Sequence, residues 1–196
     1  LLRPKLQSPE HLWCACGLST VDQSAPYYRR DGYWNGAVWM PYQWMFFKSA
    51  LDAGLADFAY RIADTALTLW QNECAESYCC FEHFMIESRR GAGWHQFSGL
   101  SSPIVQLFSA YYRPGTLTTG FDAFVRHTDG APDNSALDAT LDFTAAGRST
   151  VLAVLQPGPK AVTASVPCTV TTRHDGLLEL TFALDAPCTV TISIHP

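Results

Sequence analysis

The residues best suited to chemistry are concentrated between positions 81 and 101. This stretch combines carboxylates, imidazoles and an amide with aromatic rings, around a flexible Gly-Ala-Gly run at 91–93. Hydrolysis of a glycosidic bond needs a carboxylic acid on one side of the bond and a carboxylate on the other. The candidate side chains of this stretch are Glu82, His83, Glu87, Trp94, His95 and Gln96.

A second candidate stretch lies upstream, at residues 33–44, and is rich in aromatic rings and amides. Aromatic faces stack on the C–H faces of sugar rings, while fixed polar groups bind the hydroxyls. The two stretches together favour a carbohydrate site. The residues of this second stretch that could bind such a substrate are Tyr33, Trp34, Trp39 and Gln43.

Each of these residues also has an ordinary structural interpretation. Glu82 could form an ion pair with Arg89 or Arg90 in a loop. Trp34 and Trp39 could be core aromatics, since aromatic side chains dominate protein cores. The other polar residues could be satisfied surface groups, so both interpretations stay open on composition alone.

A zinc site is a further possibility, and we rank it below buried thiols. The Cys-x-Cys and Cys-Cys spacings differ from the two-residue separation of common zinc knuckles. We therefore expect no metal and no cofactor. The ligands of such a site would be Cys14, Cys16, Cys79, Cys80 and His83.

The composition is that of a soluble, aromatic-rich globular protein. Of its 196 residues, 13% are aromatic and 16% are charged, and the net charge is -5. A chain with net negative charge lacks the cationic surface that nucleic acid attracts. No apolar run approaches the roughly 20 residues of a membrane span. The seven cysteines do not resemble a disulfide framework, and the compartment stays open, with the cytoplasm slightly favoured.

The spacing of apolar residues changes at Pro114-Gly115, which is typical of a helix stop followed by a turn. Upstream, the period is helical, and long aromatic loops join the helices; loops of that length are usually functional. We place a domain boundary there. The expected helices span residues 38–53, 57–70 and 102–112, and the loops span 13–37 and 71–101.

Downstream of the boundary, the apolar residues alternate with period two, which predicts a small antiparallel β-sandwich at 115–196. The short sequence Pro-Cys-Thr-Val-Thr occurs twice, at 167–171 and 187–191. If those two strands pair, Cys168 and Cys188 could approach each other; two buried free thiols are the alternative. The expected strands span residues 136–143, 151–155, 161–166, 177–182 and 188–192.

The motif Tyr-Trp-Asn-Gly-Ala-Val-Trp at 33–39 resembles the Tyr-Trp-x-Gly-x-x-Trp signature of glycoside hydrolase family 63 and related enzymes. Glu-His-Phe at 82–84, followed by the Gly-Ala-Gly turn, is similar to the second active-site segment of that group. The group includes processing α-glucosidases, mannosylglycerate hydrolases and trehalase-like proteins. The resemblance implies an (α/α)6 toroid and an inverting, α-glucosidase-like mechanism in which Glu82 is the general base.

The resemblance also implies a general acid, an Asp ahead of the Gly-Leu-Ser landmark at 17–19. Asp22 and Asp31 both follow that landmark. We therefore expect separate α and β domains: the C-terminal part of a toroid at 1–114, followed by the sandwich. The chain would carry half of a glycosidase site and need the N-terminal remainder of the enzyme, or a companion chain, to act on its carbohydrate substrate. The alternative is a non-catalytic carbohydrate-binding or structural fragment.

Overall fold

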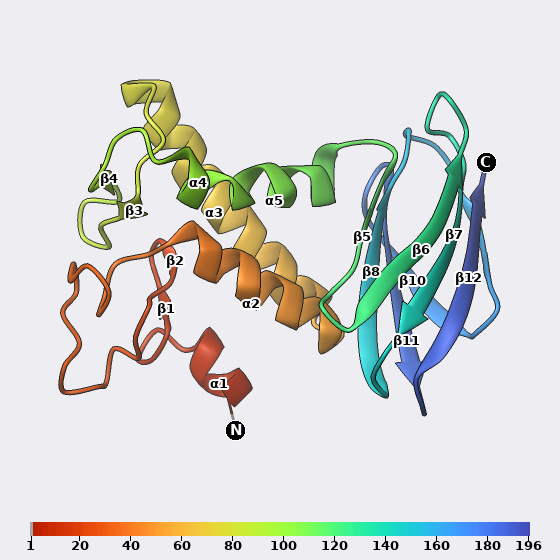
Figure 1. Cartoon of the computed structure of the whole chain (residues 1–196), viewed down its shortest axis with the longest axis horizontal. Helices are drawn as coiled ribbons and strands as arrows, with labels where there is room; N and C mark the ends of the chain where they lie inside the picture. The colour runs from red at the N-terminus through yellow and green to blue at the C-terminus, as the bar shows by residue number, and fades with distance from the viewer. Residues whose placement is uncertain (1) are drawn as a thin grey trace. The chain divides into compact units, whose positions relative to one another are not determined.

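The computed structural model describes residues 2–196, which form two compact units. The first unit comprises the chain up to Phe46 together with Tyr60–Leu107, and the second comprises Phe47–Ala59 and Phe108–Pro196. Figure 1 follows the chain through both. Within the described residues, none of the helices is both long and apolar enough to cross a membrane.

Helices and two short β-ribbons make up the part of the chain before residue 115 (Figure 1). The two ribbons are antiparallel pairs, β1 with β2 and β3 with β4. The helices are α1 (Leu2–Gln7), α2 (Met40–Asp52), α3 (Ala56–Ser77), α4 (Ser98–Ser101) and α5 (Pro103–Tyr112). The ribbon strands are β1 (Trp13–Cys14), β2 (Gly17–Leu18), β3 (His83–Phe84) and β4 (Gly91–Ala92).

The three helices expected from periodicity are present as α2, α3 and α5. Helix α3 continues seven residues beyond the expected end at residue 70, to Ser77. Leu69 lies on its buried face, and the next residue on that face, Glu73, is also buried despite its charge. A charged residue at a core position breaks the apolar pattern, so the last turns of α3 could not be recognised.

The described helices do not establish a toroid, which stays a prediction.

The second unit contains two four-stranded antiparallel sheets, ordered β10-β11-β8-β5 and β6-β7-β12-β9. Inward-facing residues of both sheets form one hydrophobic core. The rings of Phe143 and Phe182, one from each sheet, lie 5.4 Å apart within it. The strands are β5 (Thr116–Thr118), β6 (Ala123–Gly130), β7 (Leu137–Phe143), β8 (Gly147–Val154), β9 (Ala161–Ala164), β10 (Cys168–His174), β11 (Leu177–Leu184) and β12 (Cys188–His195).

The two copies of the repeated sequence lie in different sheets, so the strands that carry them do not pair. Cys168 in β10 stands opposite Phe182, and Cys188 in β12 stands opposite Phe143. Both cysteines are free thiols that pack against the core. The strand pairing that would have brought these two residues together is therefore absent, and both are free thiols that are partly rather than fully buried.

Strands β5 and β6 were not expected from the sequence, and β10 was expected only as the strand of the repeat at 167–171. In β6 only Ala123 is buried, so the strand has no alternating pattern to recognise.

The helical segment Phe47–Ala59 also belongs to the second unit. There the Asp52 carboxylate accepts hydrogen bonds from the backbone N–H groups of Phe121 and Asp122, at 2.7 and 3.0 Å. The boundary at 114/115 stays a prediction.

The sheet β10-β11-β8-β5 contains a buried ion pair between Arg173 and Glu179. The Glu179 side chain is only 4% exposed, and that of Arg173 is 19% exposed. Arg173 also binds the exposed carboxylate of Asp57 at 2.6 Å. Removing one partner of a buried pair leaves an uncompensated buried charge, which is strongly destabilising.

We predict that Arg173→Ala lowers the free energy of unfolding by about 3 kcal/mol, because Glu179 then stays buried without its cation. Urea denaturation of the whole chain measures this. Arg126→Ala is the matched control, since its exposed pair with Asp142 should matter little. Equal effects of the two substitutions would contradict the prediction.

Candidate active site

Glu82 lies immediately before β3 and is half-buried. Its two carboxylate oxygens accept hydrogen bonds from different segments. The Tyr33 hydroxyl donates to Oε1, and the Trp94 backbone N–H donates to Oε2 at 3.3 Å. These two donors fix the orientation of the carboxylate. They also bring together the two stretches that the sequence singled out.

Gly93 lets the chain after β4 approach Glu82 closely. Its φ of +77° lies in the left-handed region, and a Cβ at this position would collide with Oε2 of Glu82. The Glu82 N–H also donates to the Trp94 carbonyl at 3.1 Å. Only glycine combines this backbone conformation with this approach.

Four rings form a cluster beside Glu82, with Tyr33 at its centre. Tyr33 is nearly perpendicular to Trp34, Trp39 and His83, at centroid distances of 5.6, 4.9 and 5.1 Å. Trp34 stacks on Trp39 at 3.7 Å, and the other three rings support Tyr33. The hydrogen bond to Glu82 raises the pKa of Tyr33, so the phenol keeps its proton and remains a donor.

Trp34 is the exposed end of this cluster. It is 51% exposed although one of its faces packs on Trp39, which is fully buried. A sugar ring could therefore reach Trp34 but not Trp39. The structure places Trp34 at the surface of the cluster that carries the Tyr33–Glu82 hydrogen bond.

Trp39 and Gln43 lie beneath this surface, with no exposed area, although both were expected to bind substrate. The Trp39 indole N–H donates to the Tyr33 carbonyl at 2.7 Å. The Gln43 amide accepts from the Leu18 N–H and donates to the Leu18 carbonyl, both at 2.8 Å. Their contacts position the surrounding loops, and they offer a ligand no surface.

His83 was considered above as one of the candidate side chains at 81–101 and as a zinc ligand, and in the structure it belongs to the ring cluster. Its ring stacks on Trp39 at 5.1 Å. Burial lowers the pKa of His83, and its Nδ1 has no hydrogen-bond partner within the described chain. Among residues 2–196 there is no group of His, Cys, Asp and Glu side chains arranged to hold a metal ion.

The β3–β4 hairpin is anchored to α3 by a buried carboxylate. Glu73 is 3% exposed and accepts hydrogen bonds from Arg90 Nε and the Gly91 N–H, each at 2.8 Å. Arg90 also pairs with Glu76 at 2.7 Å. Arg90 therefore pairs with two carboxylates of α3, and within the described chain the structure shows no ion pair between Arg90 and Glu82.

Two further contacts join the hairpin to the upstream stretch. The backbones of Val38 and Phe84 pair through N–H···O bonds of 2.9 and 2.8 Å. Asp31 accepts a hydrogen bond from the Ile86 N–H at 2.7 Å, and a longer one from Glu87 N–H. No local sequence pattern signalled the anchoring residues Asp31, Glu73 and Arg90.

The remaining candidates lie at the surface. The Glu87 side chain is exposed on the hairpin turn, and its backbone contacts Asp31 and not Glu82. Trp94 is 60% exposed and tilts against His95, with centroids 5.5 Å apart. Trp94 and Gln96 also line a shallow hollow that continues to Gly99. The structure thus brings Trp94 to Glu82 and leaves Glu87 apart.

Residues 2–93 match the family model of the mannosylglycerate hydrolase MGH1-like glycoside hydrolase domain. These residues are a segment of a glycoside hydrolase domain. The motif at 33–39 and the segment from Glu82 to Gly93 both fall within the MGH1-like segment, so the family resemblance recognised in the sequence is confirmed there.

Two individual proteins, both from Thermus thermophilus, are similar to parts of the chain. The MGH1-like segment is 30% identical over 84 residues to a mannosylglycerate hydrolase of this organism, a match that covers 43% of this chain and 20% of that enzyme. The crystal structure of an uncharacterized conserved protein from another strain matches 55% of this chain and 25% of its own, with 27% identity and a TM-score of 0.44. The matched part thus spans only about a fifth of the curated relative.

The Glu73–Arg90 anchor predicts a specific pH dependence. The hydrogen bond from Arg90 lowers the pKa of Glu73 from 4.5 to about 2. A group with a lowered folded-state pKa stabilises the fold above its unfolded pKa, and this stabilisation is lost as pH falls through the folded value. We expect Glu73→Gln to be less stable than the original chain at pH 6, with the difference shrinking between pH 5 and pH 2.

Thermal or urea unfolding at a series of pH values measures this difference. Glu10→Gln, an exposed carboxylate near the N-terminus, is the control. A gap between the original chain and Glu73→Gln that stays constant down to pH 2 would show that Glu73 is not stabilised as a carboxylate.

Proposed function

We propose that this chain contributes the general base and part of the sugar-binding surface of an inverting, α-glucosidase-like glycoside hydrolase. The observation that carries the proposal is the Glu82 carboxylate, held by Tyr33 and Trp94 beside the exposed ring of Trp34. The MGH1-like segment supplies the reaction class.

In this mechanism Glu82 accepts a proton from a water molecule. The water oxygen attacks the anomeric carbon from the face opposite the leaving group, and a new C–O bond forms as the glycosidic C–O bond breaks. A second carboxyl group protonates the departing oxygen. Inverting enzymes hold the two carboxyl groups roughly 6.5–9.5 Å apart, which leaves room for the water.

Tyr33 and the Trp94 N–H prepare Glu82 for this step. Each carboxylate oxygen has two lone-pair positions, so an oxygen that already accepts one hydrogen bond can still accept another from water. Fixed donors keep the carboxylate in one orientation before substrate arrives, which avoids reorganisation during the reaction. A positioned base of this kind typically contributes 10²–10⁴-fold to the rate.

The substrate surface would be built from the exposed residues around Glu82. Trp34 would stack on the sugar ring, and Trp94 and Gln96 would lie beside it. Glu87 and His95 would contact hydroxyl groups further from the bond that is cleaved. Because the curated relative is named a mannosylglycerate hydrolase, mannosylglycerate is a substrate to assay beside α-glucosides.

The general acid would come from outside these residues, from the N-terminal remainder of the same enzyme or from a companion chain. One face of α5 supports this view, because Val105, Phe108 and Tyr112 share it and are 67%, 51% and 42% exposed. Exposed apolar patches of this kind mark association surfaces. Further helices of an (α/α)6 toroid would cover it. The 196-residue chain alone should not hydrolyse glycosides.

We predict that Glu82→Gln, in the full natural protein that contains this sequence, lowers kcat by about 10²–10⁴-fold while substrate still binds. Glutamine keeps the shape of the side chain but cannot take the proton. Steady-state kinetics with α-glucosides and mannosylglycerate measures this, with Glu10→Gln as the control. Retained activity in Glu82→Gln together with loss in Glu87→Gln would move the base to Glu87.

We predict that Trp34→Ala raises KM more than it lowers kcat, because stacking on the sugar ring is lost while Glu82 keeps both of its donors. An aromatic contact of this kind is worth about 0.5–1.5 kcal/mol beyond its buried area. Circular dichroism of the variant checks that the fold is retained. An unchanged KM would remove Trp34 from the substrate surface.

A further inference from the structure

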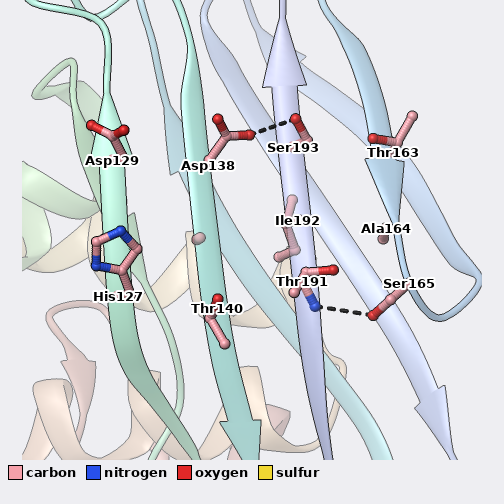
Figure 2. Close-up of a pocket in the computed structure, with 11 residues that line it drawn as sticks. His127, Asp129, Asp138, Thr140, Thr163, Ala164, Ser165, Thr191, Ile192 and Ser193 are labelled. Carbon is pink, nitrogen blue, oxygen red and sulfur yellow. Dashed lines mark hydrogen bonds between the residues drawn. The ribbon is translucent and has the colours of Figure 1, made fainter.

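The outer face of the sheet β6-β7-β12-β9 contains an open groove of about 450 Å³. All four strands contribute to its floor, as Figure 2 shows. The groove lies wholly within the second unit and uses no residue of the MGH1-like segment. An inference about it is therefore independent of the proposed hydrolase activity.

One row of polar side chains crosses the whole sheet along the groove. Asp129 in β6 stands opposite Asp138 in β7, Asp138 stands opposite Ser193 in β12, and Ser193 stands opposite Thr163 in β9. Directly opposed residues share a face of the sheet. In Figure 2 these four side chains lie at one level, and the Ser193 hydroxyl donates to Asp138.

A second row runs beside the first and consists of His127, Thr140 and Thr191. Residues two apart on a strand are separated by about 7 Å, so the rows form a regular grid of polar groups. Phe124 extends the grid, since it lies opposite Asp142 on the same face and is 58% exposed. The surface thus offers hydroxyls, carboxylates, the imidazole of His127 and the exposed aromatic ring of Phe124.

The Asp129–Asp138 pair is unfavourable for the fold by itself. Like charges directly opposite each other on neighbouring strands are destabilising. Among the described residues that line the groove, none is a lysine or arginine. Two imidazoles come near: His127 lines the groove, and His195 Nε2 lies 3.4 Å from Asp138. Packing of the sheet does not require two carboxylates here, which points to a ligand.

The chemistry of the groove fits a neutral, polyhydroxylated ligand. A carboxylate accepts hydrogen bonds from two neighbouring hydroxyls at once, and Ser and Thr hydroxyls both donate and accept. An acidic ligand would be repelled by the two aspartates. A metal ion is disfavoured, since no described group of side chains is arranged to hold one.

We propose that this groove binds a neutral oligosaccharide. Several rows of polar groups follow one another along the strands, so an oligosaccharide fits the surface better than a single sugar does. Asp129 and Asp138 accept hydrogen bonds from sugar hydroxyls, Ser193 and Thr191 contact neighbouring hydroxyls, and the Phe124 ring stacks on a sugar further along.

The test is a titration of the whole ¹⁵N-labelled chain, followed by two-dimensional NMR. The probes are the neutral trisaccharides maltotriose, cellotriose and mannotriose, the acidic trisaccharide trigalacturonic acid, and the diamine putrescine. We expect at least one neutral trisaccharide to shift the amides of residues 138–140 and 191–193 in a saturable way. Trigalacturonic acid and putrescine should not shift them.

Asp129→Ala separates binding from folding. It removes the like-charge contact, so its melting temperature should be equal to or above that of the original chain, while the neutral trisaccharide binds about tenfold more weakly. Thr172→Val, an exposed position on β10 of the other sheet, is the control and should leave binding unchanged.

Three results would overturn the proposal. These are no shift of the groove amides by any neutral trisaccharide at millimolar concentration, shifts by trigalacturonic acid or putrescine instead, and unchanged affinity in Asp129→Ala. None of these results bears on Glu82, so the sugar-binding groove and the proposed hydrolase site are tested independently.

Discussion

The arrangement of the candidate site depends on the buried carboxylate of Glu73. It binds both the Arg90 side chain and the Gly91 backbone, and so fixes strand β4 against helix α3. Strand β3 pairs with β4 and also with Val38, which lies within the motif at 33–39. Because of this chain of contacts, two segments about 50 residues apart in sequence meet at Glu82 and Tyr33. Without the anchor, strand β4 and the Gly-rich segment would lose their contact with α3, while the contacts of β3 and the hairpin turn with Val38 and Asp31 would remain.

The residues of the two motifs divide into a buried and an exposed set. Trp39, Gln43 and His83 are buried and hold the loops and rings in place. Trp34 and Trp94 are exposed. Glu82 is half-buried and is held by the Tyr33 hydroxyl and by the Trp94 backbone N–H. In the proposed mechanism such a site is preorganised, because Glu82 is oriented before substrate binds. The outer face of the sheet β6-β7-β12-β9 is built differently, because there the strand register aligns the polar side chains into rows.

Part of this could be predicted from the sequence, and the limits have physical causes. Apolar periodicity located α2, α3 and α5, and alternation located strands with one buried face, such as β7. It could not locate β6, because one buried residue gives no period. A motif singled out Glu82 as a candidate, but its hydrogen bond with Tyr33 is a long-range contact that no local pattern encodes. The complete burial of Trp39 and Gln43 was not foreseen, since motif membership does not say which side chains face outward.

The central claim is that Glu82 presents its carboxylate to the water that attacks a bound sugar. A crystal structure of the full natural protein with a bound substrate analogue tests this directly. The account predicts a sugar ring on Trp34, a water held between Glu82 and the anomeric carbon, and a second carboxyl group roughly 6.5–9.5 Å from Glu82 that this chain does not supply. A sugar bound away from Glu82, or a pair of catalytic carboxylates that excludes it, would contradict the account.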